Sequence, residues 1–174
     1  MAVAAVVFFV MGLESRNGGG GSLDASALDR LYAWRGALNM ALANPIQSIG
    51  LSNFSEALYF YIDRWSGFRD MAAHSTWLTV LAETGFIGFA VFVLMIRQCW
   101  RTGLKALRSA STVGGSPHVR AASLGLLAGL GGFCAAGSFL TQAFSWQIYI
   151  LLALTTATAS SLRLSASEPV GRPV

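Results

Sequence analysis

An unbroken apolar stretch, Trp77–Ile96, limits what this chain can fold into more than any other feature. It is 20 residues long and contains one charged side chain, Glu83, near its start. A helix of that length rises about 30 Å, which matches the hydrocarbon core of a bilayer. Ser75 and Thr76 are favourable residues for starting a helix. We therefore expect a membrane-spanning helix here, with His74 at the membrane–water interface beside the positive end of the helix dipole.

The composition supports a membrane protein. Hydrophobic residues make up 54% of the chain and charged residues only 11%, whereas soluble domains have roughly 25% charged residues. The net charge of +4 is small, and no run of basic residues alternates with aromatic ones. This pattern argues against nucleic acid as a partner.

Further apolar stretches complete a helical, polytopic arrangement. The first, Ala2–Leu13, is too short for a full span, and we interpret it as the end of a span in a longer protein. Gly125 and Gly129 form a spacing that allows another helix to approach closely. The sequence thus predicts an all-α membrane protein with a partial span and three full spans, at residues 1–13, 74–96, 121–140 and 141–164.

The distribution of charge orients these spans. The connection 97–120 contains five basic residues and no acidic residue, and such connections face the cytoplasm. Arg163 and Arg172 place the tail, 165–174, on the same side. Segment 14–73, which holds six of the eight acidic residues, is then extracytoplasmic.

The extracytoplasmic segment is predicted to be largely helical. A glycine-rich linker at 17–22 precedes an amphipathic pattern in which apolar residues recur at spacings of three and four; these are Leu28, Leu31, Ala33, Trp34, Leu38 and Leu42. Asn44-Pro45 should end that helix. A weaker second helix is predicted over Asn53–Trp65, with aromatic residues suited to a membrane interface.

Several short motifs, taken in this order, resemble one superfamily of bacterial membrane glycosyltransferases. They are Asp24-Ala-Ser-Ala-x-x-Arg30-x-x-Ala-Trp34, Asn44-Pro45 with Gly50 and Phe54, Ala73-His74-Ser75, Leu81-Ala-Glu-Thr-Gly85-Phe-Ile-Gly88, and Gly137-Ser-Phe-Leu. Together they resemble the O-antigen ligases and O-antigen polymerases, and most closely the O-glycosylation ligases associated with exosortase systems. Ser75, where asparagine is frequent in the wider superfamily, favours that branch. Pro45-Ile-Gln-Ser-Ile-Gly50 departs from the glycine-rich turn found in many ligases.

The resemblance implies a bacterial inner-membrane enzyme with its active loop, 14–73, on the periplasmic side. It implies a polyprenyl-diphosphate-linked glycan as donor, and a hydroxyl of a lipid, polysaccharide or protein as acceptor. The superfamily's proteins are longer, so this chain would correspond to their C-terminal part. As a truncated chain it would be inactive if spans that form the lipid-carrier groove are missing.

His74 and Arg30 are the candidate catalytic residues. An imidazole titrates near neutral pH and can accept the proton of an attacking hydroxyl; the alternative is a helix-capping histidine. A guanidinium can hold a diphosphate through paired hydrogen bonds; the alternative is a surface ion pair of little energetic consequence.

Four further residues are candidate substrate contacts: Arg35, Arg64, Arg69 and Glu83. Each arginine has the alternative of a solvated surface position. Glu83 lies where an unpaired charge is costly, so it should be paired, protonated or facing water. The two histidines lie on opposite sides of the membrane by this topology, and no Asp-x-Asp pair is present, so we expect no metal site. No cofactor is implied.

The competing interpretation is a non-enzymatic membrane protein, either a transporter or a subunit of an export system. Transporters place polar groups within broken spans near the membrane midplane. The candidate polar groups here lie in the predicted outer segment, which favours the enzyme.

Overall fold

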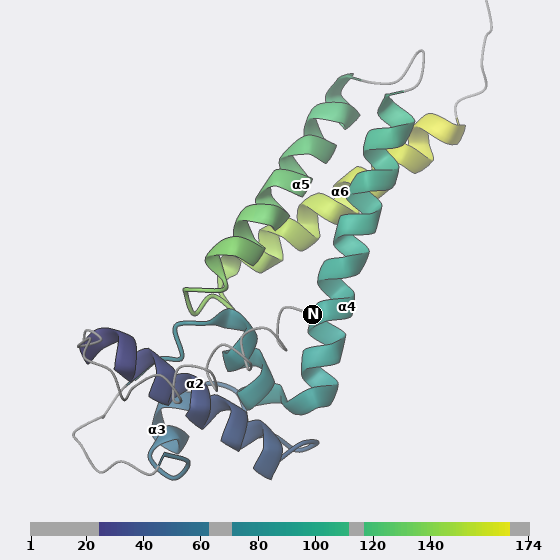
Figure 1. The fold of residues 1–174 in the computed structure, drawn as a ribbon. Helices are drawn as coiled ribbons and strands as arrows, with labels where there is room; N and C mark the ends of the chain where they lie inside the picture. The colour runs from purple at the N-terminus through teal and green to yellow at the C-terminus, as the bar shows by residue number, and fades with distance from the viewer. Residues whose placement is uncertain (1–24, 63–70, 112–116, 168–174) are drawn as a thin grey trace, which may run out of the picture.

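The structure, a computed structural model, describes residues 25–62, 71–111 and 117–167. This part of the chain is helical and contains no strand, which confirms the predicted all-α class. Its elements are α2 (Ala25–Ala43), α3 (Phe54–Leu58), α4 (Thr76–Ala110), α5 (Pro117–Ala136) and α6 (Trp146–Ser167). Figure 1 shows α5 and α6 beside the C-terminal part of α4, with α2 and α3 gathered at one end of this bundle.

Helix α4 is a helical hairpin with a short arm, residues 76–84, and a long arm, residues 86–110. Gly85 leaves the helical region with φ 67° and ψ −173°. The rings of Trp77 and Phe92 lie 6.0 Å apart between centroids, although 15 residues of straight helix would separate them by about 22 Å. The segment predicted as one span, Trp77–Ile96, is therefore helical but doubles back on itself at Gly85.

The hairpin depends on close backbone contacts at its vertex. A Cβ atom on Gly85 would lie 2.8 Å from the carbonyl oxygen of Pro45. That same oxygen accepts a hydrogen bond from the N–H of Phe86 at 2.9 Å, which satisfies a donor at the start of the second arm. A Cβ atom on Gly88 would overlap the side chain of Thr84. The Gly85-Phe-Ile-Gly88 motif thus forms the vertex.

Two apolar cores hold the molecule together. The first joins the long arm of α4 to α5 and α6, and includes Phe92, Ile96, Leu126, Leu130, Phe133, Ile148 and Leu151. The second joins α2 and α3 to the short arm of α4, and includes Ala33, Ala37, Met40, Phe54, Leu58, Leu78 and Ala82. The short arm belongs to both cores because Val80 packs in the first and Leu78 in the second.

Helix α2 ends at Ala43, as Asn44-Pro45 predicted. Its buried face overlaps the predicted apolar pattern at Ala33 and, in part, at Trp34 and Leu38, but it does not include Leu42. Ala33, Ala37 and Met40 are fully buried, whereas Leu42 is 69% exposed. Small side chains let α2 lie close to its neighbours; a Cβ atom on Gly36 would overlap Leu58. The second predicted helix, Asn53–Trp65, is reduced to α3, and residues 63–65 lie outside the described residues.

By length and composition alone, two helices in the described part of the chain, α4 and α5, could cross a membrane. Because α4 reverses at Gly85, only the part after Gly85 could do so as one continuous helix. The side chains of α6 are described only as far as Ser161, so its predicted span, 141–164, stays a prediction. Several of its hydroxyl side chains bond to the carbonyl four residues earlier, as Thr155 does to Leu151 at 2.7 Å and Thr158 to Leu154 at 2.7 Å. Such internal bonds reduce the cost of burying hydroxyls in an apolar environment.

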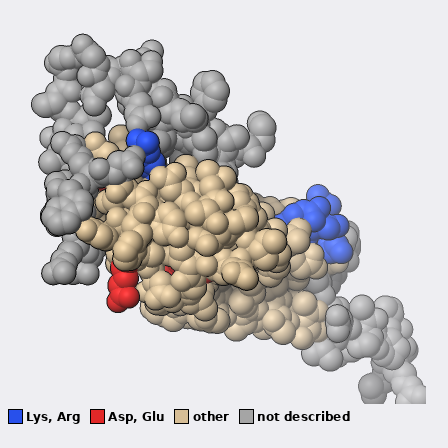
Figure 2. All heavy atoms as spheres, turned by 90° about the horizontal axis from the view of Figure 1, so that it is seen from below, with Lys and Arg blue, Asp and Glu red and all other residues tan. Residues whose placement is uncertain are grey.

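Charged side chains lie towards the ends of the molecule. In Figure 2 basic side chains appear at two separate places, and most of the face between them is uncharged. Exposed basic residues on the distal part of α4 and the start of α5 are Arg97, Arg101, Lys105, Arg108 and Arg120. In Figure 1 this end lies away from α2 and α3.

Candidate active site

His74 lies in the short connection that leads into α4. Its side chain is exposed, and its backbone has a φ of 46°, in the left-handed region that non-glycine residues rarely adopt. The residues on both sides are buried and fixed. Ala73 accepts a hydrogen bond from the indole Nε1 of Trp34 at 2.8 Å, and the N–H of Thr76 donates to the carbonyl of Gly137 at 2.7 Å. Hydrogen bonds on both sides therefore fix the backbone that carries the exposed imidazole.

Thr76 is the junction between His74 and the α5–α6 turn. Its side chain is fully buried, and its Oγ1 donates to the carbonyl of Leu140 at 2.8 Å and accepts the N–H of Gln142 at 2.9 Å. Ser75 occupies the N-cap position of α4, but without a side-chain capping bond. The sequence analysis did not assign Thr76 a functional role; its place directly after His74-Ser75 was the available signal.

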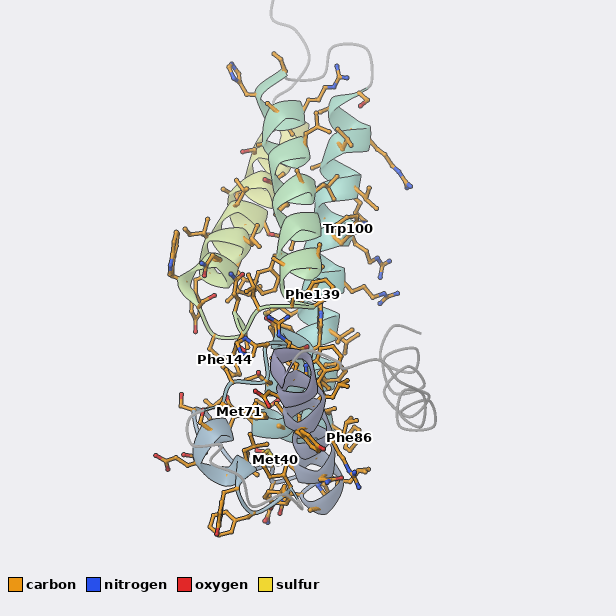
Figure 3. The ribbon with its side chains drawn as sticks, turned by 60° about the vertical axis from the view of Figure 1, so that its left-hand side comes forward. Met40, Met71, Phe86, Trp100, Phe139 and Phe144 are labelled. Atoms are coloured by element: carbon orange, nitrogen blue, oxygen red, sulfur yellow. The ribbon has the colours of Figure 1, made fainter. Side chains whose placement is uncertain are left out.

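The Gly137-Ser-Phe-Leu motif packs directly against this junction. A Cβ atom on Gly137 would lie 3.2 Å from the Cβ of Thr76, so glycine allows the close approach. Ser138 accepts a hydrogen bond from Trp77 Nε1 at 3.3 Å. Figure 3 shows Phe139 and Phe144 at this turn, between the three-helix part and α2. Two motifs that are 63 residues apart thus form one structural unit.

Arg30 lies one helical turn before Trp34 on the same side of α2. Residues four apart on a helix have Cβ atoms about 5–6 Å from each other, so the exposed Arg30 guanidinium extends from the helix face that is bonded to Ala73. Arg35 is also exposed, but a position five residues from Arg30 is rotated by about 140° around the helix. The geometry brings Arg30 and His74 to the same end of the molecule and directs Arg35 elsewhere on α2.

Glu83 is buried, with 4% of its surface exposed, in the short arm of α4. Its Oε1 accepts a hydrogen bond from the N–H of Phe54 at 3.3 Å, and its backbone carbonyl accepts one from Ser48 Oγ at 2.6 Å. The backbone N–H of Phe54 therefore supplies a partner for the buried Glu83 carboxylate. In this position Glu83 fixes the segment between α2 and α3 against the hairpin.

The remaining predicted site residues, Arg64 and Arg69, lie outside the described residues. Within the described ranges, no group of three His, Cys, Asp or Glu side chains is arranged to hold a metal ion. The free cysteines Cys99 and Cys134 are buried and half-buried.

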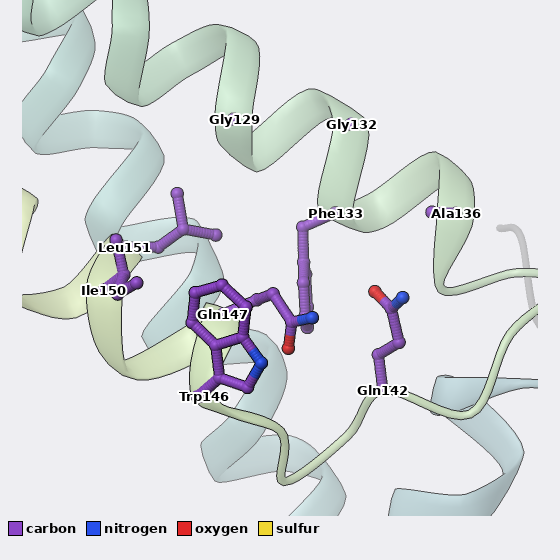
Figure 4. Close-up of a pocket in the computed structure, with 9 residues that line it drawn as sticks. All are labelled: Gly129, Gly132, Phe133, Ala136, Gln142, Trp146, Gln147, Ile150 and Leu151. Atoms are coloured by element: carbon purple, nitrogen blue, oxygen red, sulfur yellow. The ribbon is translucent and has the colours of Figure 1, made fainter.

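A groove of about 320 Å³ between α5 and α6 opens near the same junction. Its walls are mainly apolar, and Gln142 lies at its end nearest the α5–α6 turn (Figure 4). Trp146 and Ile150 of α6 lie across the groove from Gly129 and Gly132 of α5. The sequence analysis missed this groove. Its signal was the series of small residues along α5.

Comparison with known proteins assigns the N-terminal part of these features, up to the hairpin in α4, whereas the α5–α6 turn and its groove lie beyond the matched residues. The family model described as O-antigen ligase matches residues 1–93 of the 174. The match includes Arg30, Trp34, His74 and the hairpin vertex, and it ends within the long arm of α4. No curated protein and no solved structure matches the chain. Because the match covers more than half of the sequence, this chain belongs to the O-antigen ligase family.

Proposed function

We propose that this protein transfers a glycan from a polyprenyl-diphosphate carrier to an acceptor hydroxyl at the outer face of the bacterial inner membrane. The observation that carries the proposal is the hydrogen bond from Trp34 Nε1 to the carbonyl of Ala73. It joins the helix that bears Arg30 to the residue directly before His74. This bond links the segment that carries Arg30, the cation for the leaving group, to the segment that carries His74, the base for the incoming hydroxyl.

The two residues suit the two halves of a displacement reaction. His74 accepts the proton of the acceptor hydroxyl, whose oxygen forms a bond to the anomeric carbon of the sugar. The bond between that carbon and the diphosphate oxygen breaks, and the diphosphate leaves with the electron pair. Arg30 holds the departing phosphate through its planar donors. A direct displacement inverts the configuration at the anomeric carbon.

The apolar groove between α5 and α6 suits the hydrocarbon part of a lipid substrate, because its walls are mainly apolar and it begins where Gln142 bonds to Thr76. Ser75 beside His74 supports placement in the exosortase-associated branch. The acceptor is a hydroxyl of a lipid, a polysaccharide or a protein.

The first test replaces His74. His74→Ala should lower transfer from a polyprenyl-diphosphate donor by about 10²–10⁴-fold, the usual contribution of a general acid or base. His118→Ala is the matched control, because His118 is exposed at the start of α5, at the opposite end of the molecule. Equal activity of the two variants would remove His74 from the mechanism.

The second test separates charge from shape at Arg30. Arg30→Lys keeps the positive charge but loses the planar pair of donors, so transfer should fall strongly if the guanidinium binds the diphosphate. An exposed ion pair would contribute only about 0–1 kcal/mol, and its loss would leave transfer almost unchanged. Normal rates in both Arg30→Lys and Arg30→Ala, with the helical content of the wild type, would refute the assignment. Arg35 would be tested next.

A further inference from the structure

An open hollow in the surface, called the cavity below, lies where the end of α2, the segment 44–53 and α3 meet. It has a volume of about 450 Å³ and is lined by polar and aromatic side chains, among them Asn44, Asn53, Glu56, Phe60 and Tyr61. The catalytic proposal does not use this cavity. Asn44 is ten residues along α2 from Trp34, a distance of about 15 Å on a helix. A group bound here would therefore lie beyond the reacting bond.

The polar groups of the cavity are held in fixed positions. Asn44 Nδ2 donates to the hydroxyl of Tyr61 at 2.8 Å, and Asn53 Nδ2 donates to the carbonyl of Ile49 at 3.0 Å. Each amide oxygen can still accept, and the Tyr61 hydroxyl can still donate. The Glu56 carboxylate is exposed on α3. The cavity thus combines oriented donors and acceptors that can pair with neighbouring hydroxyl groups.

An exposed aromatic ring stands beside these polar groups. Phe60 is 79% exposed, and its ring meets Tyr59 edge to face, with centroids 5.4 Å apart and planes at 84°. Tyr59 is itself 54% exposed, so the two rings form an exposed aromatic pair beside convergent polar groups, an arrangement suited to ligand binding. A flat apolar ring next to amide and carboxylate groups matches a pyranose, which has one apolar C–H face and a rim of hydroxyls.

We propose that this cavity is a carbohydrate subsite that binds a neutral or amino sugar of the transferred or accepting glycan. The proposal rests on the proposed transfer function for its biological role, but not for the binding itself. Glu56 selects the class of sugar, because a carboxylate at the rim repels uronic and other acidic sugars and attracts an amino group.

Insertion of Phe60 into the membrane interface is the competing explanation for its exposure. The same cavity wall carries two asparagine amides and a carboxylate, which would lose hydration if the surface entered the bilayer. This favours the sugar, and the experiment below includes the membrane as one of its outcomes.

The experiment measures sugar binding to the full chain in lipid nanodiscs by saturation-transfer NMR. The probes are N,N′,N″-triacetylchitotriose, which is neutral and is called chitotriose below, and trigalacturonate, which is acidic. Phe60→Ala should weaken chitotriose binding by about tenfold or more, as loss of a central aromatic contact typically does. Phe60→Trp should retain binding. Leu51→Ala is the control, because Leu51 is exposed nearby but does not line the cavity. Trigalacturonate should bind more weakly than chitotriose, and Glu56→Gln should reduce that difference.

Two outcomes would overturn the subsite. One is equal chitotriose binding by Phe60→Ala and the wild type. The other is greater quenching of tryptophan fluorescence by brominated lipids in Phe60→Trp than in the wild type, which has five tryptophans of its own. Transfer assays separate this proposal from the catalytic one. Phe60→Ala should raise KM for the glycan with little change in kcat, whereas His74→Ala should lower kcat and leave chitotriose binding intact. If His74→Ala keeps the kcat of the wild type while Phe60→Ala still weakens chitotriose binding, the proposed reaction is refuted and the subsite is retained.

Discussion

The left-handed backbone at His74 is the local feature that neighbouring residues must maintain. Such a conformation in a non-glycine residue persists only where the surrounding structure fixes it. Here the hydrogen bonds to Ala73 and from Thr76 lie on either side. The sequence analysis placed Trp34 only in the amphipathic pattern and in the motif that begins at Asp24. Its bond to Ala73 spans 39 residues, and no local spacing pattern encodes a contact of that range.

Trp34→Phe should therefore lower transfer without unfolding the protein. The ring is retained, and one hydrogen bond contributes about 0.5–1.5 kcal/mol to stability. Misplacement of a catalytic group by about 1 Å can cost 10²-fold in rate, so kcat should fall much more than the melting temperature. Trp100→Phe is the control, because Trp100 projects from the long arm of α4 (Figure 3). Equal kcat values for the two variants would show that the Trp34 bond does not position His74.

At the scale of elements, the hairpin in α4 is tested most directly at its vertex. The backbone angles of Gly85 fall in a region that is essentially restricted to glycine, and a side chain would also strike Pro45. Gly85→Ala should lower the free energy of unfolding by about 1–3 kcal/mol. Gly131→Ala is the matched control, because a Cβ atom there meets nothing within 4 Å; it should stabilise α5 by about 0.5–1 kcal/mol. Thermal unfolding in one detergent compares the two, and similar melting temperatures would contradict the hairpin geometry.

The hairpin also shows where prediction from sequence stops. The C-terminal end of α2 follows from a local signal, Asn44-Pro45. Helices α5 and α6 overlap the apolar stretches predicted at 121–140 and 141–164, but they begin at Pro117 and Trp146. The reversal at Gly85 does not follow from a local signal, because the apolar run continues unbroken from Trp77 to Ile96 and an isolated glycine is tolerated within a helix. The reason for the reversal is the contact with Pro45, which is 40 residues away in the sequence.

The groove between α5 and α6 gives a second prediction at this scale. Gly132 lines the groove, and a Cβ atom there meets no other atom within 4 Å. Gly132→Leu should fill the groove and raise KM for the lipid-linked donor. Gly131→Leu introduces the same side chain one position away, outside the groove lining, and changes helix propensity equally. A rise in KM that is the same in both variants would exclude the groove as the lipid site.

At the scale of the whole molecule, the orientation predicted from charge stays a prediction, and the structure shows which groups it would separate. The basic residues of α4 and the start of α5 lie at one end of the bundle, and α2 and α3 gather at the other. Hydrogen bonds join the residues beside His74 to α2 and to the α5–α6 turn. Positive charge marks the cytoplasmic side of a membrane protein. A lipid-linked diphosphate would then meet His74 and Arg30 at the outer surface. The sequence predicts the orientation from charge alone, but not the hairpin and turn that join His74 to α5 and α6.

Cysteine labelling tests this orientation in intact cells. Ser52 and Ser111 are both exposed in the structure, so a cysteine at either position should react equally well in detergent. In a background with Cys99→Ala and Cys134→Ala, a membrane-impermeant maleimide should label Ser52→Cys from outside. Ser111→Cys should react only after the inner membrane is permeabilised, because it follows the basic end of α4. The outer membrane is opened first in all samples, so that the reagent reaches the periplasm. Labelling of Ser111→Cys but not Ser52→Cys would invert the topology. It would also place His74 on the cytoplasmic side, where the proposed transfer at the outer face could not occur.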